Sequence, residues 1–213
     1  MIKISNVVRE IIQEDLVATE AIRLGILNLS AYASQIKHEV EARTLKEVKN
    51  SSIVVALSRL EIEQISSGTI SPYVPIRNIS VKGSLAELTY EKTESSLADL
   101  SIIDTSLLRS REFFAITEGL VEITIVCPRE KIPRIEAHFS TLAKSKIDKL
   151  VAITVRFPPE FLSIPNAIYT LVSALAIKRI NLVEVISTYT ELSFIVQQEN
   201  LEITLASLHR YME

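Results

Sequence analysis

The hydrophobic period of this chain changes once, and that change limits the folds that it can adopt. Up to about residue 66, apolar residues recur three and four positions apart, as on one face of a helix. After residue 79, short strand-like runs alternate with helical stripes. Between these regions lies ISSGTISPYVPIRN (Ile65–Asn78), whose glycine, prolines and small polar residues are typical of a turn or linker. We therefore expect an α+β protein with an all-helical N-terminal domain.

The N-terminal segment predicts four helices. The first has a stripe of Val7, Val8, Ile11 and Ile12, and the second covers about Leu16 to Leu24 and ends at Gly25. A third helix is expected to begin near Asn28 or Ser30, and a fourth near Asn50. Charged residues occur throughout the first fifteen positions, MIKISNVVREIIQED. This stretch is therefore predicted to begin a helix and not to be a signal peptide.

Residues 79–213 predict, in order, strand, helix, strand, strand, helix, strand, helix, strand, strand, helix. This order corresponds to two βαββαβ modules with one strand missing. Glu118-Gly119 is the expected turn of the first hairpin. The strand at 150–157 could close the first module or open the second. Alternatively, segment 79–92 could supply two short strands around Gly83. We expect a helical domain at 1–66, a linker at 67–78, and modules at 79–148 and 149–213.

Composition excludes several classes of site. Four glycines cannot build the usual phosphate-binding loops, and the single Cys127 excludes an internal disulfide. His38, His138 and His209 stand far apart in sequence, so we expect no metal and no cofactor. The sequence shows neither a pair of carboxylates spaced for catalysis nor a nucleophile motif, so we do not expect an enzyme. The longest uncharged stretch, Phe161–Ile177, is too short and polar to span a membrane, and the cysteine usage fits a reducing cytoplasm.

The C-terminal segment resembles the ACT domain, especially the type at the regulatory end of aspartate kinases. In that family a helix leads through a G-I-N turn into a strand, a Ser- or Thr-containing turn, a second strand and a final helix with L-H. This chain has Ile180-Asn181, then STYTELS at Ser187–Ser193, and then Leu208-His209. The similarity covers about Ile164–Met212 and is only topological over 79–157.

The resemblance implies a small regulator, often an amino acid, bound where paired domains meet. The resemblance implies that the ligand contacts are Pro165, Asn166, Arg179, Ile180 and Asn181. Arg179 stands at the position where the family prefers glycine. The loop Pro158–Asn166 also lacks glycine, which usually lets a carboxylate approach backbone N–H groups. Arg179 could itself hold a carboxylate, or it could be a cation at an exposed helix end.

The N-terminal segment is similar to a helix-turn-helix of prokaryotic regulators. EAIRLGILNLSAYASQIKHEV would supply helix, turn and helix, and NSSIVVALSRL the following helix. The candidate phosphate contacts are basic residues of these segments: Lys37, His38, Arg43, Lys46, Lys49 and Arg59. The alternative is that they are solvated charges, since Glu39, Glu41 and Glu47 lie among them and the net charge is −3.

Two functions compete. The first is a dimeric regulatory protein that senses an amino acid or related metabolite through ACT-like modules, with DNA as a potential second partner. The second is a ligand-free module for dimerisation or protein interaction, because exposed sheet edges invite pairing.

Overall fold

The computed structural model describes residues 3–60, 72–103 and 112–212. It divides into two compact units, Met1–Pro72 and Tyr73–Glu213. This division falls inside the predicted linker at 67–78, of which residues 67–71 lie outside the described residues.

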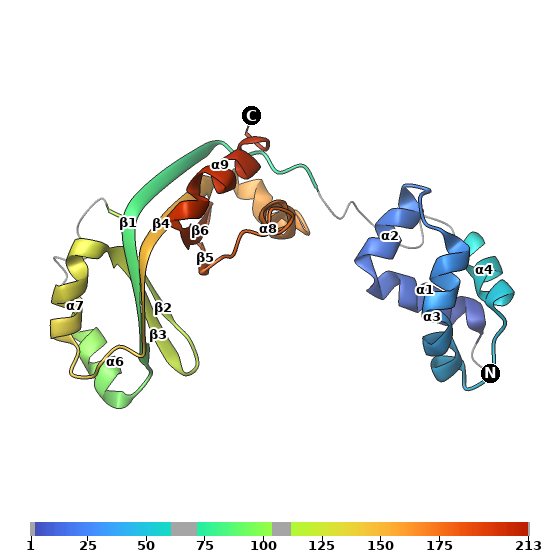
Figure 1. Cartoon of the computed structure of the whole chain (residues 1–213), viewed down its shortest axis with the longest axis horizontal. Coiled ribbons are helices and arrows are strands. Elements are labelled where there is room, and N and C mark those ends of the chain that lie inside the picture. The colour runs from blue at the N-terminus through green and yellow to red at the C-terminus, as the bar shows by residue number, and fades with distance from the viewer. Residues whose placement is uncertain (1–2, 61–71, 104–111, 213) are drawn as a thin grey trace. The chain divides into compact units, whose positions relative to one another are not determined.

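The N-terminal unit is helical, as its apolar stripes predict (Figure 1). Its described helices are α1 (Ile4–Glu14), α2 (Leu16–Arg23), α3 (Leu29–Thr44) and α4 (Asn50–Ser58). α3 packs mainly on α4 and α1, and α2 packs on α1. The predicted stripe of α1 is fully buried in this core, because residues three and four apart share one helix face.

Short polar residues set the helix boundaries of this unit. Asp15 ends α1 and begins α2, where its side chain accepts a hydrogen bond from Ala18 N at 2.9 Å. Asn28 caps α3 in the same way, at 3.1 Å from Ala31 N. Such side chains satisfy N–H groups that a helix start leaves without partners. Gly25, with a φ of 71°, allows the tight exit from α2.

The C-terminal unit is built on one antiparallel sheet in the order β2-β3-β1-β4-β6-β5. The strands are β1 (Asn78–Glu91), β2 (Ala115–Glu118), β3 (Glu122–Pro128), β4 (Ser145–Arg156), β5 (Glu184–Ser187) and β6 (Glu191–Gln197). The helices are α6 (Glu94–Ser101), α7 (Ile132–His138), α8 (Ala167–Ala176) and α9 (Leu201–His209), with short 3-10 turns at Arg129–Lys131, Pro159–Ser163 and Gln198–Asn200.

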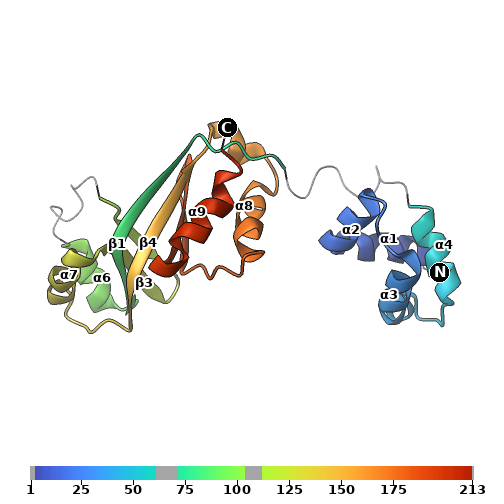
Figure 2. The ribbon, with the colours of Figure 1, turned by 45° about the horizontal axis from the view of Figure 1, so that its top comes forward.

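The two central strands, β1 and β4, are long and run side by side through the whole unit (Figures 1 and 2). We call β2, β3, α6, α7 and the adjoining parts of β1 and β4 the first half. The second half consists of β5, β6, α8, α9 and the other parts of the two long strands. In each half the helices cover one face of the sheet, and apolar side chains fill the space between them.

A third apolar cluster occupies the opposite, helix-free face. Its buried members come from strands of both halves: Leu85, Val126, Leu150, Ala152 and Ile195. Alanine and isoleucine side chains from β2 and β5, Ala115 and Ile186, pack against it. The sheet is therefore curled enough for its two ends to share one core.

The alternative of two short strands in segment 79–92 does not match the structure. β1 is a single strand, and Gly83 and Ser84 lie at a shift in its register against β4. Ser84 has a φ of 55°, so the extra residue is absorbed as a bulge without ending the strand. The strand expected at 150–157 likewise begins earlier, at Ser145, and the predicted module boundary at 148/149 falls inside it.

Two helices differ in length from what the spacing of apolar residues predicts. One helix is predicted by Ile132, Ile135, Phe139 and Leu142, and another by Leu97, Leu100, Ile103, Leu107 and Leu108. The first ends at His138, and Leu142 is 96% exposed. The chain turns away because Asp99 of α6 accepts hydrogen bonds from Ser140 N at 2.8 Å and Ser140 Oγ at 2.7 Å. The helix expected from Leu97 to Leu108 is present as far as Ser101, and residues 104–108 lie outside the described residues.

Candidate functional site

The predicted ligand residues lie at the two ends of α8. Pro165 and Asn166 precede its first turn, whereas Arg179 and Asn181 follow its last. A ten-residue helix is about 15 Å long, so these groups do not converge on one small ligand within a single chain. The predicted set is thus two separate surfaces, and its role in binding stays a prediction.

At the N-terminal end of α8, Asn166 adopts the left-handed conformation, with a φ of 66°. Its carbonyl oxygen accepts hydrogen bonds from Thr170 N at 2.9 Å and Thr170 Oγ1 at 3.1 Å. Its side chain is exposed and makes no capping hydrogen bond. Asparagine tolerates this conformation better than most residues, so it can stand where a glycine would otherwise be needed.

At the C-terminal end, Arg179 is also left-handed, with a φ of 55°. Its N–H donates to Ala176 O at 2.8 Å, and Ile180 N–H donates to Leu175 O at 3.2 Å. These bonds close the helix in the manner usually assigned to glycine. Ile180 is buried, whereas Arg179 and Asn181 are exposed. Arg179 therefore closes the C-terminal end of α8 in the left-handed conformation and places a cation beside it.

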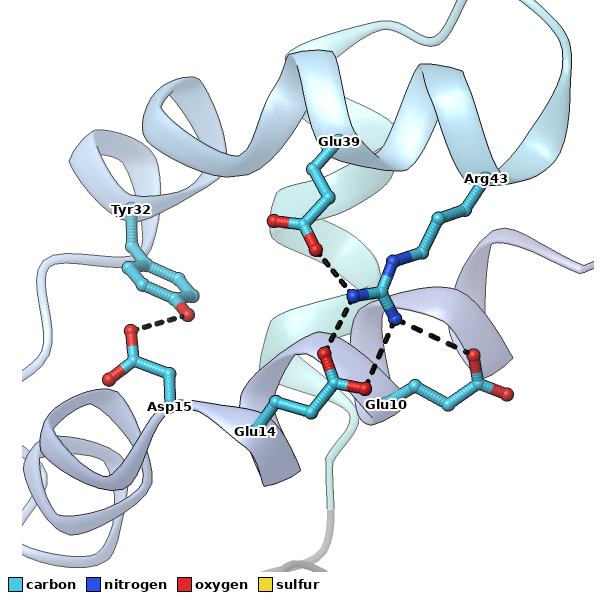
Figure 3. A network of polar contacts seen from close by, with 6 residues as sticks. All are labelled: Glu10, Glu14, Asp15, Tyr32, Glu39 and Arg43. Atoms are coloured by element: carbon cyan, nitrogen blue, oxygen red, sulfur yellow. Dashed lines mark hydrogen bonds and ion pairs between the residues drawn. The ribbon is translucent and has the colours of Figure 1, made fainter. Parts of the chain in front are cut away.

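The predicted DNA contacts do not all present available charges. Arg43 lies among three glutamates, with distances of 2.6 Å to Glu14, 2.5 Å to Glu39 and 4.0 Å to Glu10 (Figure 3). Its hydrogen bond lowers the pKa of Glu14. Lys37 pairs with Glu41 at 3.7 Å. The remaining four side chains are exposed: His38, Lys46, Lys49 and Arg59.

A surface hollow of about 450 Å³ adjoins these basic residues. It is lined by Lys37, Glu41, Glu47, Val48 and Lys49. Acidic and basic side chains alternate around it, so its charge does not single out an anion or a cation.

Glu87 and Glu184, which belong to no motif in the sequence, form an acidic pair in the C-terminal unit. Glu87 of β1 is only 6% exposed, and Glu184 of β5 is half-buried. The pKa of Glu87 is raised to about 7, mainly by burial and to a lesser extent by the charge of Glu184. Burial also raises the pKa of Glu184. A charged residue inside the apolar run of β1 was the available signal, but its partner is distant in sequence.

Other reactive side chains of the C-terminal unit belong to the core. Cys127 is fully buried, and burial raises the pKa of its thiol to about 12, so it remains protonated near neutral pH. His138 Nε2 lies 2.7 Å from Asp99 O and links α7 to α6.

Within the described ranges, no three His, Cys, Asp or Glu side chains are arranged to hold a metal ion. Nor does any helix in those ranges have the length and apolar character needed to cross a membrane.

No protein-family model and no curated protein matches this chain at a significant level. Solved structures do match. The ligand-free regulatory subunit of aspartate kinase from Thermus thermophilus is 13% identical, with a TM-score of 0.51, over 65% of this chain and 98% of that one. The corresponding Thermus flavus subunit is 10% identical, with a TM-score of 0.52, over 64% and 98%. Aspartate kinase from Clostridium acetobutylicum is 14% identical, with a TM-score of 0.51, over 65% of this chain and 35% of the kinase.

At these identities the likeness concerns the fold alone. The matched share is close in size to the C-terminal unit, and it accounts for nearly all of the two Thermus subunits. The curled antiparallel sheet with its helices therefore has the ACT-like fold of aspartate kinase regulatory domains.

Proposed function

We propose that this protein is a regulator that senses an amino acid or a related metabolite through its ACT-like unit. The observation that supports this most is that a share of this chain close in size to its C-terminal unit covers 98% of a regulatory subunit of aspartate kinase. The Clostridium kinase, of which this chain matches 35%, is an allosteric enzyme. A regulator of this kind needs an effector that binds one arrangement of the protein better than another.

The strand order supports two ACT-like modules that share strands. In the first half the order β4-β1-β3-β2, with α6 and α7, is that of a βαββαβ ferredoxin-like module. In the second half, β1-β4-β6-β5 with α8 and α9 repeats this order. The fourth strand of the second module, which the predicted pattern was missing, would then be the N-terminal part of β1. This part precedes the first module in the chain.

The proposed effector contacts are the exposed residues at the ends of α8, with the second end supplied by a partner copy in a dimer. A thermal-shift screen of amino acids tests the proposal, because a ligand that binds only the folded protein raises the melting temperature. Asn166→Ala and Asn181→Ala should each weaken the response. Asn200→Ala is the matched control, since Asn200 also precedes a helix and makes no capping hydrogen bond with its side chain. A flat screen would count against amino-acid sensing.

We further propose that the helical unit is a helix-turn-helix-like output domain that binds DNA. The exposed Lys46 and Lys49 would contact phosphates, whereas Arg43 is held by glutamates. Fluorescence anisotropy with duplex DNA at several salt concentrations tests this. Lys49→Gln should weaken binding and reduce the salt slope by about 1, whereas Arg43→Gln should leave the slope unchanged.

The alternative function is dimerisation or protein interaction without a ligand. Its specific support is the edge strand β5, where Val185 is 41% exposed next to unpaired backbone groups. Sedimentation of the wild type and of Val185→Lys tests it, because a charged edge blocks strand pairing. A change from dimer to monomer, with no amino acid active in the screen, would favour this alternative.

A further inference from the structure

The helix-free face of the C-terminal unit brings two glutamates from opposite halves into one apolar cluster. Glu87 lies two residues after Leu85 on β1 and opposite Val126 on β3. Glu184 lies opposite Ile195 on β6. Leu85, Val126 and Ile195 are all buried members of the central cluster, so both carboxyls are on its side of the sheet.

The Glu87 carboxyl lacks the compensation that buried acids normally have. The Oε2 atom of Glu87 is buried and has no hydrogen-bond partner among residues 3–60, 72–103 and 112–212. The charged group that acts on Glu87 is Glu184, which carries the same sign. A buried carboxylate without a cation or hydrogen-bond donors is strongly unfavourable, and a second carboxylate makes it more so. The arrangement would be satisfied by a positive group placed between the two.

We propose that Glu87 and Glu184 bind the ammonium group of a small aliphatic amine, whose hydrocarbon chain packs on the surrounding apolar side chains. An ammonium group offers several N–H donors, which two carboxylates can accept. The leucine, valine and isoleucine side chains of the cluster are apolar, which suits contact with an alkyl chain. Glu184 is half-buried, so the pair is reachable from solvent on its side.

An organic amine fits this pair better than a metal ion. Calcium takes six to eight oxygen ligands, and magnesium needs six in a near-ideal octahedron. In the part of the chain that the structure describes, no third acidic or histidine ligand joins the two glutamates. The next polar side chains along this face, Thr89 and Thr124, hydrogen-bond to each other at 3.3 Å. The proposed site is also independent of the residues at the ends of α8.

The test is thermal denaturation of the full chain at pH 8 with 1,5-diaminopentane as the probe. Ionic strength is held constant with NaCl, and 1,5-pentanediol is the neutral probe of the same length. At about 100 times its Kd, the amine should raise Tm by roughly 5 °C in the wild type, and the diol should not. Glu87→Gln and Glu184→Gln should each remove the rise, because the amide keeps the side-chain shape without the charge. Glu202→Gln, on the exposed surface of α9, should retain it.

Three results would overturn the inference. They are no rise in the wild type, an equal rise in Glu87→Gln and Glu184→Gln, or a rise with Mg²⁺ or Ca²⁺ but not with the amine. Asn166→Ala and Asn181→Ala should respond to the amine as the wild type does. Loss of amino-acid sensing at α8 would therefore leave this site intact, and failure of the amine would leave the proposed function to be decided by its own screen.

Discussion

Charged side chains meet in both units of the molecule, but the two units compensate them in opposite ways. In the helical unit, Arg43 lies at the surface between Glu10, Glu14 and Glu39, so each negative charge has a cation nearby (Figure 3). In the sheet unit, Glu87 and Glu184 face the same apolar cluster, and the charge of Glu184 acts on Glu87. The first arrangement can be held by the folded chain alone. The second costs free energy whenever both carboxyls are ionised, so it should respond to pH and to added cations.

The largest expected effect is a loss of stability of the sheet unit as pH rises from 5 to 8. The Glu87 carboxyl ionises near pH 4.5 in the unfolded chain and near pH 7 in the folded one. Between these values the folded state holds a proton that the unfolded state has released, so stability falls with pH. By linkage this amounts to about 3 kcal/mol, or a fall in Tm of roughly 5–10 °C. Circular dichroism melts of the wild type and of Glu87→Gln at each pH measure it.

The glutamine variant should lack this component of the pH dependence, because it has no carboxyl to titrate. Glu202→Gln, which alters an exposed glutamate of α9, should follow the wild type. If the wild type and Glu87→Gln kept a constant difference in Tm from pH 5 to pH 8, the contrast between the two charge clusters would be wrong.

A smaller effect is expected at Asp15 of the helical unit, whose two carboxylate oxygens each accept a hydrogen bond. Asp15 accepts from Ala18 N at 2.9 Å and from Tyr32 Oη at 3.0 Å, and Tyr32 is 6% exposed. Asp15→Ala should cost about 2–3 kcal/mol, because it removes a helix cap and leaves a buried hydroxyl without its acceptor. Urea unfolding monitored by hydrogen exchange in residues 3–60 measures the loss.

Tyr32→Phe is the matched control for Asp15, since it removes the hydroxyl together with its need for a partner. It should cost only about 1 kcal/mol. Equal losses in the two variants would mean that the cap and the buried hydroxyl do not both depend on Asp15.

The smallest effect is expected at Arg43. Its ion pairs are exposed to solvent, so Arg43→Gln should lower Tm of the helical unit by no more than roughly 1–3 °C at low salt. In about 1 M NaCl the difference should vanish, because the Debye length is then only about 3 Å. Melts at low and high salt test this. A large loss that persisted in high salt would show that Arg43 is a packing residue and not part of a screened surface network.

Local elements were largely predictable from sequence. The stripe of Val7 to Ile12, the hairpin turn at Glu118-Gly119 and the strands near 184–197 all depend on residues within a few positions of one another. The ACT-like resemblance was also carried by such a stretch, and the likeness to solved structures confirms it at the level of the fold. The length of α7 was mispredicted because Ser140 bonds to Asp99 on another helix.

The candidate sites were much less predictable. The five ligand residues were chosen by correspondence with a family, and sequence spacing did not reveal that α8 separates them. Arg43 was a reasonable phosphate contact until the structure placed Glu14, from a different helix, 2.6 Å away. Glu87 stands in the apolar run of β1, but its neighbour Glu184 is distant in sequence, so spacing along the chain does not reveal the two together.

The sequence by itself determined the periods of the helices and strands, their order and the division into a helical and a mixed unit. Those properties follow from hydrogen bonds and side-chain directions that repeat over two to four residues. Only the tertiary structure decided that β1 and β4 run through both halves, and that the curl of the sheet brings Glu184 near Glu87. Burial and charge depend on which distant segments meet, and strand register and sheet curvature settle that only when the whole core is packed.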